Sequence, residues 1–207
     1  MGFIQLVMLM LPLLLVHCQD TLPNLYTTNP SIVTIKSCCD LRIYPPARVP
    51  SGVYKMSMGT FGWTVIQRNR KDSPVSFVRN WREYENGFGD LSTDFWYGLG
   101  SIYALTRSGQ WEMRVDFTKE DGSLSYIHYN QFKVGSASEE YKLTVGGYTG
   151  GDGDYFTTGD EPANGRMLTT LDNDNDVYSG NCAVSWKSGW WFYSCFDINP
   201  NIQPPHY

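Results

Sequence analysis

The chain has 207 residues, a length that suits one domain or one domain with a short leader. Its formal net charge is -5 and its basic residues are scattered, which argues against nucleic acid as a partner. Aromatic residues make up 15% of the chain against 18% charged residues, a balance that argues against disorder and for a compact domain packed by Trp and Tyr.

The first 18 residues have the character of a secretory leader. They carry no Asp, Glu, Lys or Arg, and the apolar run from Phe3 to Val16 is too short for a comfortable membrane span. We therefore expect a signal peptide over residues 1–18, cleaved after Cys18, and a secreted, extracellular protein. Because the usual basic segment before the apolar run is missing, an uncleaved anchor is the alternative.

Four of the five cysteines follow this leader: Cys38, Cys39, Cys182 and Cys195. An even set in an oxidising compartment is expected to form disulfides. A bridge between the last two would close a loop of a size that contributes about 3 kcal/mol in the chain-entropy model. Two free buried thiols are the alternative for that pair.

The chain after the leader divides into a lead-in and a domain. Residues 19–36 are polar and interrupted by proline, so we expect a flexible segment before a domain over residues 37–207. "SGVYKM" and "GWTVIQRN" then alternate as strands do. In "SFVRNWREYENGF" four aromatic residues recur at helical spacing, and Gly87 supplies a stop, which predicts a helix.

A second helix and a hairpin are expected next. "STDFWYGLGSIYALTRSG" predicts a helix that Ser92 or Thr93 caps and that turns Ile102 and Leu105 inward. The following run, "QWEMRVDFTKEDGSLSYIHYNQFKV", contains two alternating stretches joined across Asp121-Gly122. An Asp-Gly pair in this setting is the strongest short hairpin signal in the chain.

The last third is poor in regular structure. "YKLTVGGY" adds one more strand, and from Thr149 onward the pattern dissolves into Gly, Asp, Asn and Thr. Antiparallel strands with a few helices and a loop-rich second half predict an α+β domain. Because this loop-rich half has few strands to pair, it needs cross-links other than the hydrogen bonds of a sheet.

The run "LDNDNDVYSGNC" alternates aspartate with asparagine at Asp172, Asp174 and Asp176. Carboxylates at this spacing suit a hard cation such as calcium if the chain loops around it. An EF-hand loop is excluded, because its Gly and Glu positions hold Val177 and Ala183. A non-EF-hand calcium loop and a solvated Asp/Asn turn both remain. No nucleophile or paired base accompanies the aspartates, so we expect no enzyme.

Several motifs together resemble the fibrinogen C-terminal-like domain of fibrinogen chains, ficolins, angiopoietins, tenascins and tachylectins. The motifs are "WTVIQRN", "FVRNWREYENGFGDLSTDFWYGL", "LTRSGQWEMRVDF", "YKLTVGGYTG" and "LDNDNDVYSGNCAVSWKSGWWFYSC". The resemblance runs from about Ser51 to Cys195. It implies a small N-terminal subdomain, a central antiparallel sheet flanked by helices, and a loop-rich C-terminal subdomain that holds calcium beside a ligand pocket.

The resemblance also implies the residues of a calcium site. Asp174 and Asp176 would give side-chain oxygens, and Tyr178 and Gly180 would give backbone carbonyls. Asp172 would lie just outside the ligand set. The bound Ca²⁺ would then act on structure and not on chemistry.

The resemblance further implies a disulfide and a ligand pocket. Cys182 and Cys195 match the paired cysteines of the family. Trp186 matches an aromatic position of the pocket that holds N-acetyl groups in lectin members, together with the backbone around Cys195; core packing is its alternative role. Phe196 stands where the family usually has His, so apolar bulk is kept and a ring nitrogen is lost.

Two further departures concern the limits of the domain. The family normally continues well beyond the position of Tyr207, including a strand that returns to the central sheet, so we expect a C-terminally incomplete domain. The cysteine-ending strand between "SGVY" and "GWTV" is also missing. Cys38 and Cys39 thereby lose their usual partner, and we expect a disulfide-linked oligomer through one of them, with a vicinal bond as the alternative.

These features predict a secreted calcium-binding recognition module. The first candidate is an innate-immune-type lectin for glycans with acetyl groups. The alternative is an extracellular ligand or matrix component of the angiopoietin or tenascin type, which binds a cell-surface or matrix protein without binding sugar. Phe196 in place of His favours that alternative.

Overall fold

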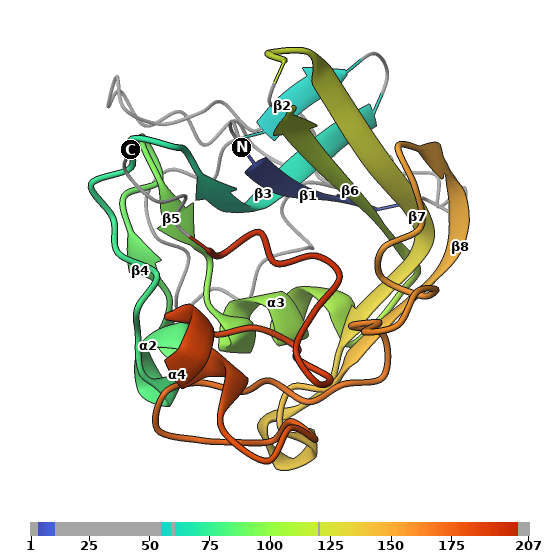
Figure 1. Cartoon of the computed structure of the whole chain (residues 1–207). Helices are drawn as coiled ribbons and strands as arrows, with labels where there is room; N and C mark the ends of the chain where they lie inside the picture. The colour runs from blue at the N-terminus through green and yellow to red at the C-terminus, as the bar shows by residue number, and fades with distance from the viewer. Residues whose placement is uncertain (1–3, 11–54, 59–60, 120, 203–207) are drawn as a thin grey trace, which may run out of the picture.

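A computed structural model describes residues 4–10, 55–58, 61–119 and 121–202 of the chain (Figure 1). The predicted lead-in over residues 19–36 and the partners of Cys38 and Cys39 lie outside the described residues. Among the described residues, no helix has the length and apolar character that a membrane span requires.

An antiparallel sheet forms the centre of the structure, and it confirms the predicted α+β class. The strand order is β4-β5-β3-β1-β6-β7-β8, and β2 also pairs with β3. The strands are β1 (Ile4–Met10), β2 (Lys55–Met58), β3 (Phe61–Asn69), β4 (Phe88–Gly89), β5 (Phe95–Trp96), β6 (Trp111–Thr118), β7 (Leu124–Val134) and β8 (Leu143–Gly151).

The hairpin predicted at Asp121-Gly122 is confirmed between β6 and β7. Gly122 has a φ of +83°, a conformation that favours glycine, and its N–H donates to the carbonyl of Lys119. The Asp121 carboxylate accepts from the N–H of Ser123 at 2.8 Å and so fixes the turn. The two strands then pair in register, with the fully buried Met113 opposite Tyr129.

The first predicted helix is present as α2 (Trp81–Asn86), which is shorter than the aromatic spacing indicated. Asn80 and Glu83 form a capping box that starts the helix, and Gly87 at a φ of +90° ends it as predicted. Tyr84 is buried on its inner face.

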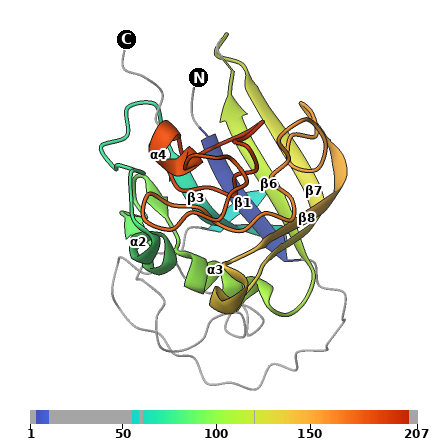
Figure 2. The same ribbon diagram turned by 60° about the horizontal axis from the view of Figure 1, so that its bottom comes forward.

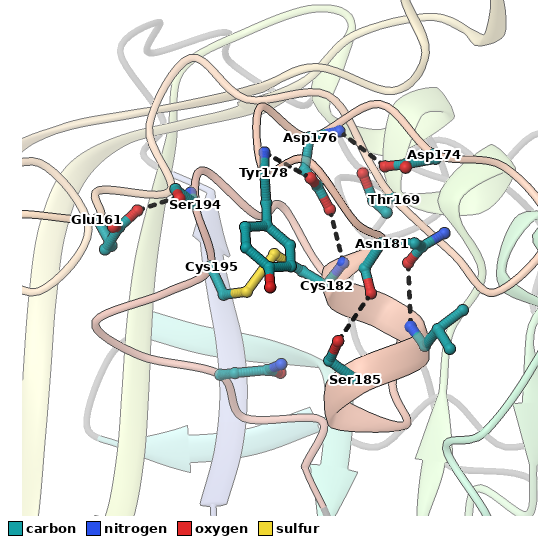
Figure 3. The surroundings of a disulfide bond; sticks show 12 residues. Glu161, Thr169, Asp174, Asp176, Tyr178, Asn181, Cys182, Ser185, Ser194 and Cys195 are labelled. Carbon is teal, nitrogen blue, oxygen red and sulfur yellow. Dashed lines mark hydrogen bonds between the residues drawn. A yellow bond between two sulfur atoms is a disulfide. The ribbon is translucent and has the colours of Figure 1, made fainter.

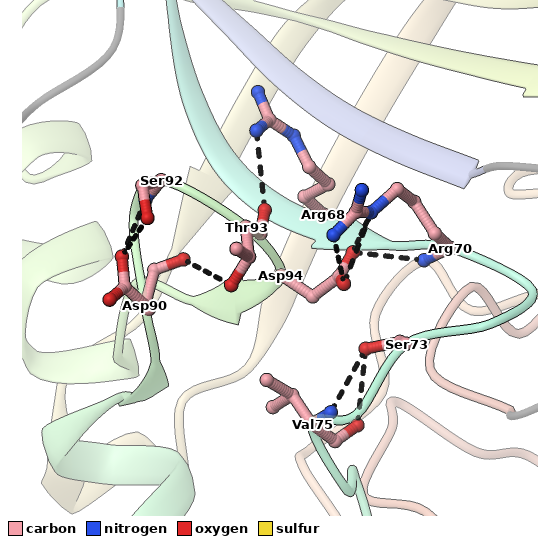
Figure 4. Close-up of polar contacts among 8 residues, drawn as sticks. All are labelled: Arg68, Arg70, Ser73, Val75, Asp90, Ser92, Thr93 and Asp94. Carbon is pink, nitrogen blue, oxygen red and sulfur yellow. Dashed lines mark hydrogen bonds and ion pairs between the residues drawn. The ribbon is translucent and has the colours of Figure 1, made fainter.

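The predicted start of the second helix at Ser92 or Thr93 is wrong. α3 begins six residues later and spans Leu99–Thr106, where Ile102 and Leu105 are buried as expected. The backbone N–H of Ser92 instead donates to the Asp90 carboxylate at 2.7 Å in a turn, and the Ser92 hydroxyl donates to the same oxygen (Figure 4). Local side-chain to backbone hydrogen bonds of this kind compete with helix initiation.

An ion pair between exposed Arg70 and buried Asp94 ties this turn to the end of β3. The Asp94 side chain is fully buried and accepts from the guanidinium of Arg70 at 2.9 Å (Figure 4). The hydrogen bond and charge of Asp94 raise the pKa of Arg70. Asp94 also accepts from the backbone N–H of Arg70, so the carboxylate is well satisfied despite its burial.

The segment after β8 contains a short helix, α4 (Cys182–Trp186), and is otherwise irregular. In Figure 2 this orange-to-red segment lies over one face of the sheet. Its end is anchored by Asn201, whose fully buried side chain accepts from Nε2 of Gln67 at 3.2 Å and donates to the carbonyl of Gly189 at 2.9 Å. Trp190 and Trp191 of this segment are buried and pack edge to face.

Candidate functional site

The two aspartates predicted as metal ligands lie on one bend before α4 (Figure 3). Asp176 accepts from the N–H of Tyr178 and from the N–H of Cys182, both at 2.9 Å. The N–H of Asp176 itself donates to Oδ1 of Asp174 at 3.3 Å. The bend therefore brings both carboxylates together, with Asp174 exposed and Asp176 half-buried.

The electrostatics of this bend favour a cation. Burial raises the pKa of Asp176, the nearby charge of Asp174 raises it further, and the N–H groups of Cys182 and Tyr178 act in the opposite direction. A divalent ion would relieve both unfavourable effects at once.

The donor set must include backbone oxygens. Within the described residues, no three His, Cys, Asp or Glu side chains are grouped so that they could hold a metal ion. The two carboxylates and the carbonyls of Tyr178 and Gly180 would form an all-oxygen set, which suits calcium and is poor for softer metals. The residues present therefore fit Ca²⁺, and their role as ligands stays a prediction.

Asp172, predicted to lie just outside the ligand set, makes structural contacts. Its Oδ1 accepts from the backbone N–H of Trp81 at 2.8 Å and from the hydroxyl of Thr170 at 2.8 Å. The bond from Trp81 ties the aspartate segment to the first turn of α2.

Two asparagines support the bend, one between the aspartates and one at the start of α4, a role that sequence reasoning missed. Nδ2 of Asn175 donates to the carbonyl of Leu168 at 2.7 Å, and Nδ2 of Asn181 donates to the carbonyl of Thr170 at 2.9 Å. Oδ1 of Asn181 also caps α4 by accepting from the N–H of Val184. The alternation of Asn175 with Asp174 and Asp176 was the sequence signal that could have revealed the role of Asn175.

A disulfide joins Cys182 to Cys195, as the resemblance implied, with Cα atoms 5.6 Å apart (Figure 3). It links the first residue of α4 to the segment that follows Trp190 and Trp191. The aspartate bend, the helix and this segment are therefore cross-linked as one unit.

An aromatic pair stands beside the disulfide. Trp186 is 49% exposed, so the alternative that it packs in the core is wrong. Its ring meets that of Phe196 edge to face, with centroids 5.0 Å apart, and Phe196 also contacts Phe192 at 5.9 Å. The three residues form an apolar wall that reaches the surface at Trp186.

The backbone next to this wall is held by acidic side chains that sequence reasoning missed. Glu161 accepts from the N–H of Ser194 at 2.6 Å, and its own N–H donates to Asp197 at 2.9 Å (Figure 3 shows the former). The N–H groups of Cys195 and Phe196 donate to no acceptor among the described residues. The segment therefore offers backbone donors beside an apolar wall.

The comparisons agree with this architecture. Residues 41–204 match the family described as "Fibrinogen beta and gamma chains, C-terminal globular domain". Angiopoietin-related protein 2 of Homo sapiens is 46% identical over 134 residues, which are 65% of this chain and 26% of that protein. Ryncolin-4 of Cerberus rynchops is 37% identical over 187 residues, which are 89% of this chain and 50% of that protein. The chain thus spans half or less of the length of these relatives.

Solved structures show the same likeness. The fibrinogen-like globe domain of human ANGPTL6 is 33% identical, with a TM-score of 0.66 over 84% of this chain and 82% of that chain. A lamprey fibrin D-dimer complexed with the peptide Gly-His-Arg-Pro-amide is 36% identical, with a TM-score of 0.63 over 70% of this chain and 49% of that chain.

Proposed function

Because this chain belongs to the fibrinogen C-terminal domain family, we propose that it is a secreted recognition module whose binding face is stiffened by a calcium ion. The observation that carries the proposal is the contact of exposed Trp186 with partly buried Phe196 beside the Cys182–Cys195 bridge. An aromatic wall that reaches the surface at one residue of a cross-linked loop suits binding. Removal of residues 1–18 as a signal peptide belongs to the same proposal.

Calcium would be held by Asp174, Asp176 and the carbonyls of Tyr178 and Gly180. The ion would supply positive charge to a bend that gathers two carboxylates, and would thereby fix its conformation. Asp176 also accepts from the N–H of Cys182, so the bound ion would help to fix the conformation of the start of α4 and of the disulfide.

The ligand we propose is a glycan carrying acetyl groups. An acetyl group needs an apolar surface for its methyl and a donor for its carbonyl. Trp186 and Phe196 supply the surface, and the N–H groups of Cys195 and Phe196 are available donors within the described segment. The Phe196 side chain adds no donor of its own.

A glycan array with matched acetylated and deacetylated sugars tests this proposal. The full chain in calcium should bind the acetylated member of each pair, and Trp186→Ala should lose that selectivity. Tyr126→Ala, which changes another partly exposed aromatic residue on β7, is the control and should bind as the native chain does. Equal signal from both members of each pair would contradict the acetyl pocket.

A second candidate is recognition of an extracellular or cell-surface protein through the same face. Phe196 favours this function. Its ring packs against Trp186 and Phe192, and it lacks the ring nitrogen with which a histidine at this position would hydrogen-bond to an acetyl group. The relation to angiopoietin-related protein 2 supports it as well. Capture of a receptor ectodomain that is lost in Trp186→Ala, with no acetyl selectivity on the array, would identify this function.

We also propose that Cys38 or Cys39 links subunits, because the strand that carries their usual partner is missing from the sequence. Electrophoresis of the secreted chain without reductant should show a dimer or larger species. Replacing both cysteines with serine should convert it to monomer, and a native chain that already runs as monomer would refute the link.

A further inference from the structure

The turn that follows β8 places a tyrosine, Tyr155, among acidic residues. The segment 143–165 around it contains no Lys, Arg or His. The four acids nearest to the tyrosine in this segment are Asp152, Asp154, Asp160 and Glu161. One of them, Asp154, stands directly before it. Tyr155 is therefore a phenol in a locally anionic stretch of the chain.

The two neighbours of Tyr155 turn its side chain outward. Asp154 points inward, since its carboxylate accepts from the hydroxyl of Tyr129 at 2.7 Å and from the N–H of Thr157 at 3.0 Å. Phe156 is buried, and its ring packs edge to face against that of Tyr129 with centroids 5.5 Å apart. Because the residues on both sides are anchored in the interior, Tyr155 projects toward solvent, where it is 37% exposed.

The phenol ring of Tyr155 lies over Gly153. A Cβ atom at Gly153 would come within 3.1 Å of the tyrosine oxygen and within 3.0 Å of the ring, so the glycine gives the ring its room. Among the described residues, no acceptor takes the proton of this hydroxyl. The oxygen is therefore held at the surface and is free to react.

Burial or charge sets other tyrosines apart from this one. Tyr84 and Tyr141 each follow a glutamate directly, but both are buried. Tyr126 is about as exposed as Tyr155, but the guanidinium carbon of Arg114 lies 4.1 Å from the centroid of its ring. Tyr126 thus faces a cation where Tyr155 follows an acid.

Two further exposed tyrosines differ in their immediate surroundings. The hydroxyl of Tyr148 donates to the carbonyl of Gly151 at 3.1 Å. Tyr178 follows the exposed Val177, and its carbonyl belongs to the proposed calcium bend. Among the tyrosines that the structure describes, Tyr155 alone combines an acid directly before it, an exposed ring and a hydroxyl that donates to none of the described residues.

A cation lies near the oxygen of Tyr155. Lys119, in the turn between β6 and β7, pairs with Asp152. The hydrogen bond to Asp152 is the largest cause that raises the pKa of Lys119, burial acts in the opposite direction, and the charges of Asp152, Asp121 and Tyr155 raise this pKa further. The ammonium is therefore within electrostatic reach of the tyrosine oxygen, and an anionic group on that oxygen would gain a partner.

We propose that Tyr155 is a site of O-sulfation by a sulfotransferase of the secretory pathway. An enzyme that binds an anionic sulfuryl donor has a cationic active site, which attracts an acidic segment such as this one. The inference rests on the secretion in the proposed function, and it is independent of the calcium bend and of the glycan.

The step transfers a sulfuryl group from an adenosine phosphosulfate. The phenolic oxygen of Tyr155 attacks the sulfur, and a new O–S bond forms. The bond from sulfur to the bridging phosphate oxygen breaks, and the adenosine phosphate leaves with its electron pair. A base of the enzyme takes the phenolic proton. The product carries a fixed negative charge beside Lys119, and such a change of charge alters what a surface attracts.

Labelling of the purified full chain tests the site without any assumption about secretion. The chain is incubated with a donor that carries radioactive sulfur and with Golgi membranes that are active on an unrelated acidic tyrosine peptide. The native chain should take up label, and Tyr155→Phe, which keeps the ring, should take up none. Tyr126→Phe, at another exposed tyrosine, is the matched control and should be labelled as the native chain is. A native chain without label, or label that persists in Tyr155→Phe, overturns the proposal.

A second variant tests the role of the acidic stretch. Asp152→Asn with Asp160→Asn should reduce the labelling several-fold and leave Tyr155 in place. Asp154 is kept, because it holds the turn through Tyr129 and Thr157. Unchanged labelling in this double variant would overturn the proposal that the acids direct the enzyme to this tyrosine.

Mass spectrometry of the chain released by a secreting animal cell line provides the readout in cells. The peptide that contains Tyr155 should gain the mass of one SO₃ group, and phosphatase should not remove it. A group that phosphatase removes would be a phosphate ester and would overturn the proposal. Retention of the chain inside the cells would instead contradict the secretion in the proposed function, and the labelling of the purified chain would still decide the sulfation.

Discussion

The N–H of Cys182 donates to Oδ2 of Asp176 at 2.9 Å, so the residue that closes the disulfide also holds a carboxylate of the proposed calcium bend. The bridge to Cys195 then connects this carboxylate to the backbone beside Phe196. Groups that share a hydrogen-bonded network respond together to mutation. We therefore expect metal, disulfide and binding face to behave as one coupled unit.

Calcium should raise the melting temperature of the full chain. At a free concentration of 100 times Kd, binding to the folded state adds about 2.7 kcal/mol. Asp174→Ala should abolish this gain and change the metal-free chain little, because Asp174 is exposed and accepts one long bond from Asp176. Calorimetry in calcium and in chelator measures both. Asp72→Ala, at another exposed aspartate, should keep the full gain, and identical native curves in the two buffers would exclude the ion.

The pH dependence of stability should change sign with calcium. Burial, with the charge of Asp174, raises the folded-state pKa of Asp176 above its usual 3.8, so the folded state holds this proton to higher pH than the unfolded state does. In chelator, its contribution to stability is therefore full below the usual pKa and falls as pH rises through the raised one. In calcium, the ion binds the ionised carboxylate of Asp176. The stabilisation by calcium should therefore increase as pH rises through the same range.

The difference between the native chain and Asp176→Asn isolates this carboxylate from the other acids. Urea unfolding from about pH 3 to pH 7 should show the two opposite trends in the native chain and neither in the variant. A native-minus-variant difference that is flat in both buffers would contradict the pKa shift.

Removing the disulfide should destabilise the domain and weaken calcium binding together. Cys182→Ser with Cys195→Ser should lower the free energy of unfolding by about 3 kcal/mol, the chain-entropy value for a loop of this size. Urea unfolding at saturating and at zero calcium measures both effects. Cys38→Ser with Cys39→Ser is the control and should leave the calcium response intact. A bridge-free chain that responds to calcium as strongly as the native one would refute the coupling.

Local chemistry explains which elements could be predicted from the sequence. The Asp121-Gly122 turn and the Gly87 stop were found because a turn residue acts on its own backbone. The start of α2 could have been placed better, since Asn80 and Glu83 carry a capping-box spacing. α3 was placed too early because Ser92 is a good cap by type, yet it donates to Asp90 in a turn.

Long-range contacts explain what the sequence did not reveal. The spacing of Asp174 and Asp176 placed both on one bend, but Glu161 reaches Ser194 across 33 positions and no pattern announces it. Ile4–Met10 pairs with β3 and β6, two strands that lie far along the chain. An apolar run of that length predicts a leader as readily as a buried strand.

Asn201 should be far more sensitive to substitution than its place near the described end suggests. Asn201→Ala leaves Nε2 of Gln67 with one acceptor fewer and the carbonyl of Gly189 without this donor. With a cost of about 1–3 kcal/mol for each buried group left unsatisfied, we expect a loss of about 3 kcal/mol in urea unfolding. Asn130→Ala, at an exposed asparagine on β7, should cost well under half of that. Equal losses would show that the anchor contributes little.

Phe196→His should strengthen binding to acetylated sugars if the pocket is of the lectin kind. A histidine ring keeps much of the edge contact with Trp186 and Phe192, and it adds the nitrogen that Phe196 lacks. One added hydrogen bond contributes about 0.5–1.5 kcal/mol, so Kd should fall roughly 2- to 10-fold.

Titration calorimetry with N-acetylglucosamine and with glucosamine measures the effect of Phe196→His. The gain should be confined to the acetylated sugar and should vanish in the double variant with Trp186→Ala, because the acetyl methyl then lacks its wall. Phe196→Leu, which is apolar and has no donor, should bind no better than the native chain. An unchanged affinity in Phe196→His would shift the balance to protein recognition, since the native phenylalanine would then be part of a surface with no acetyl site.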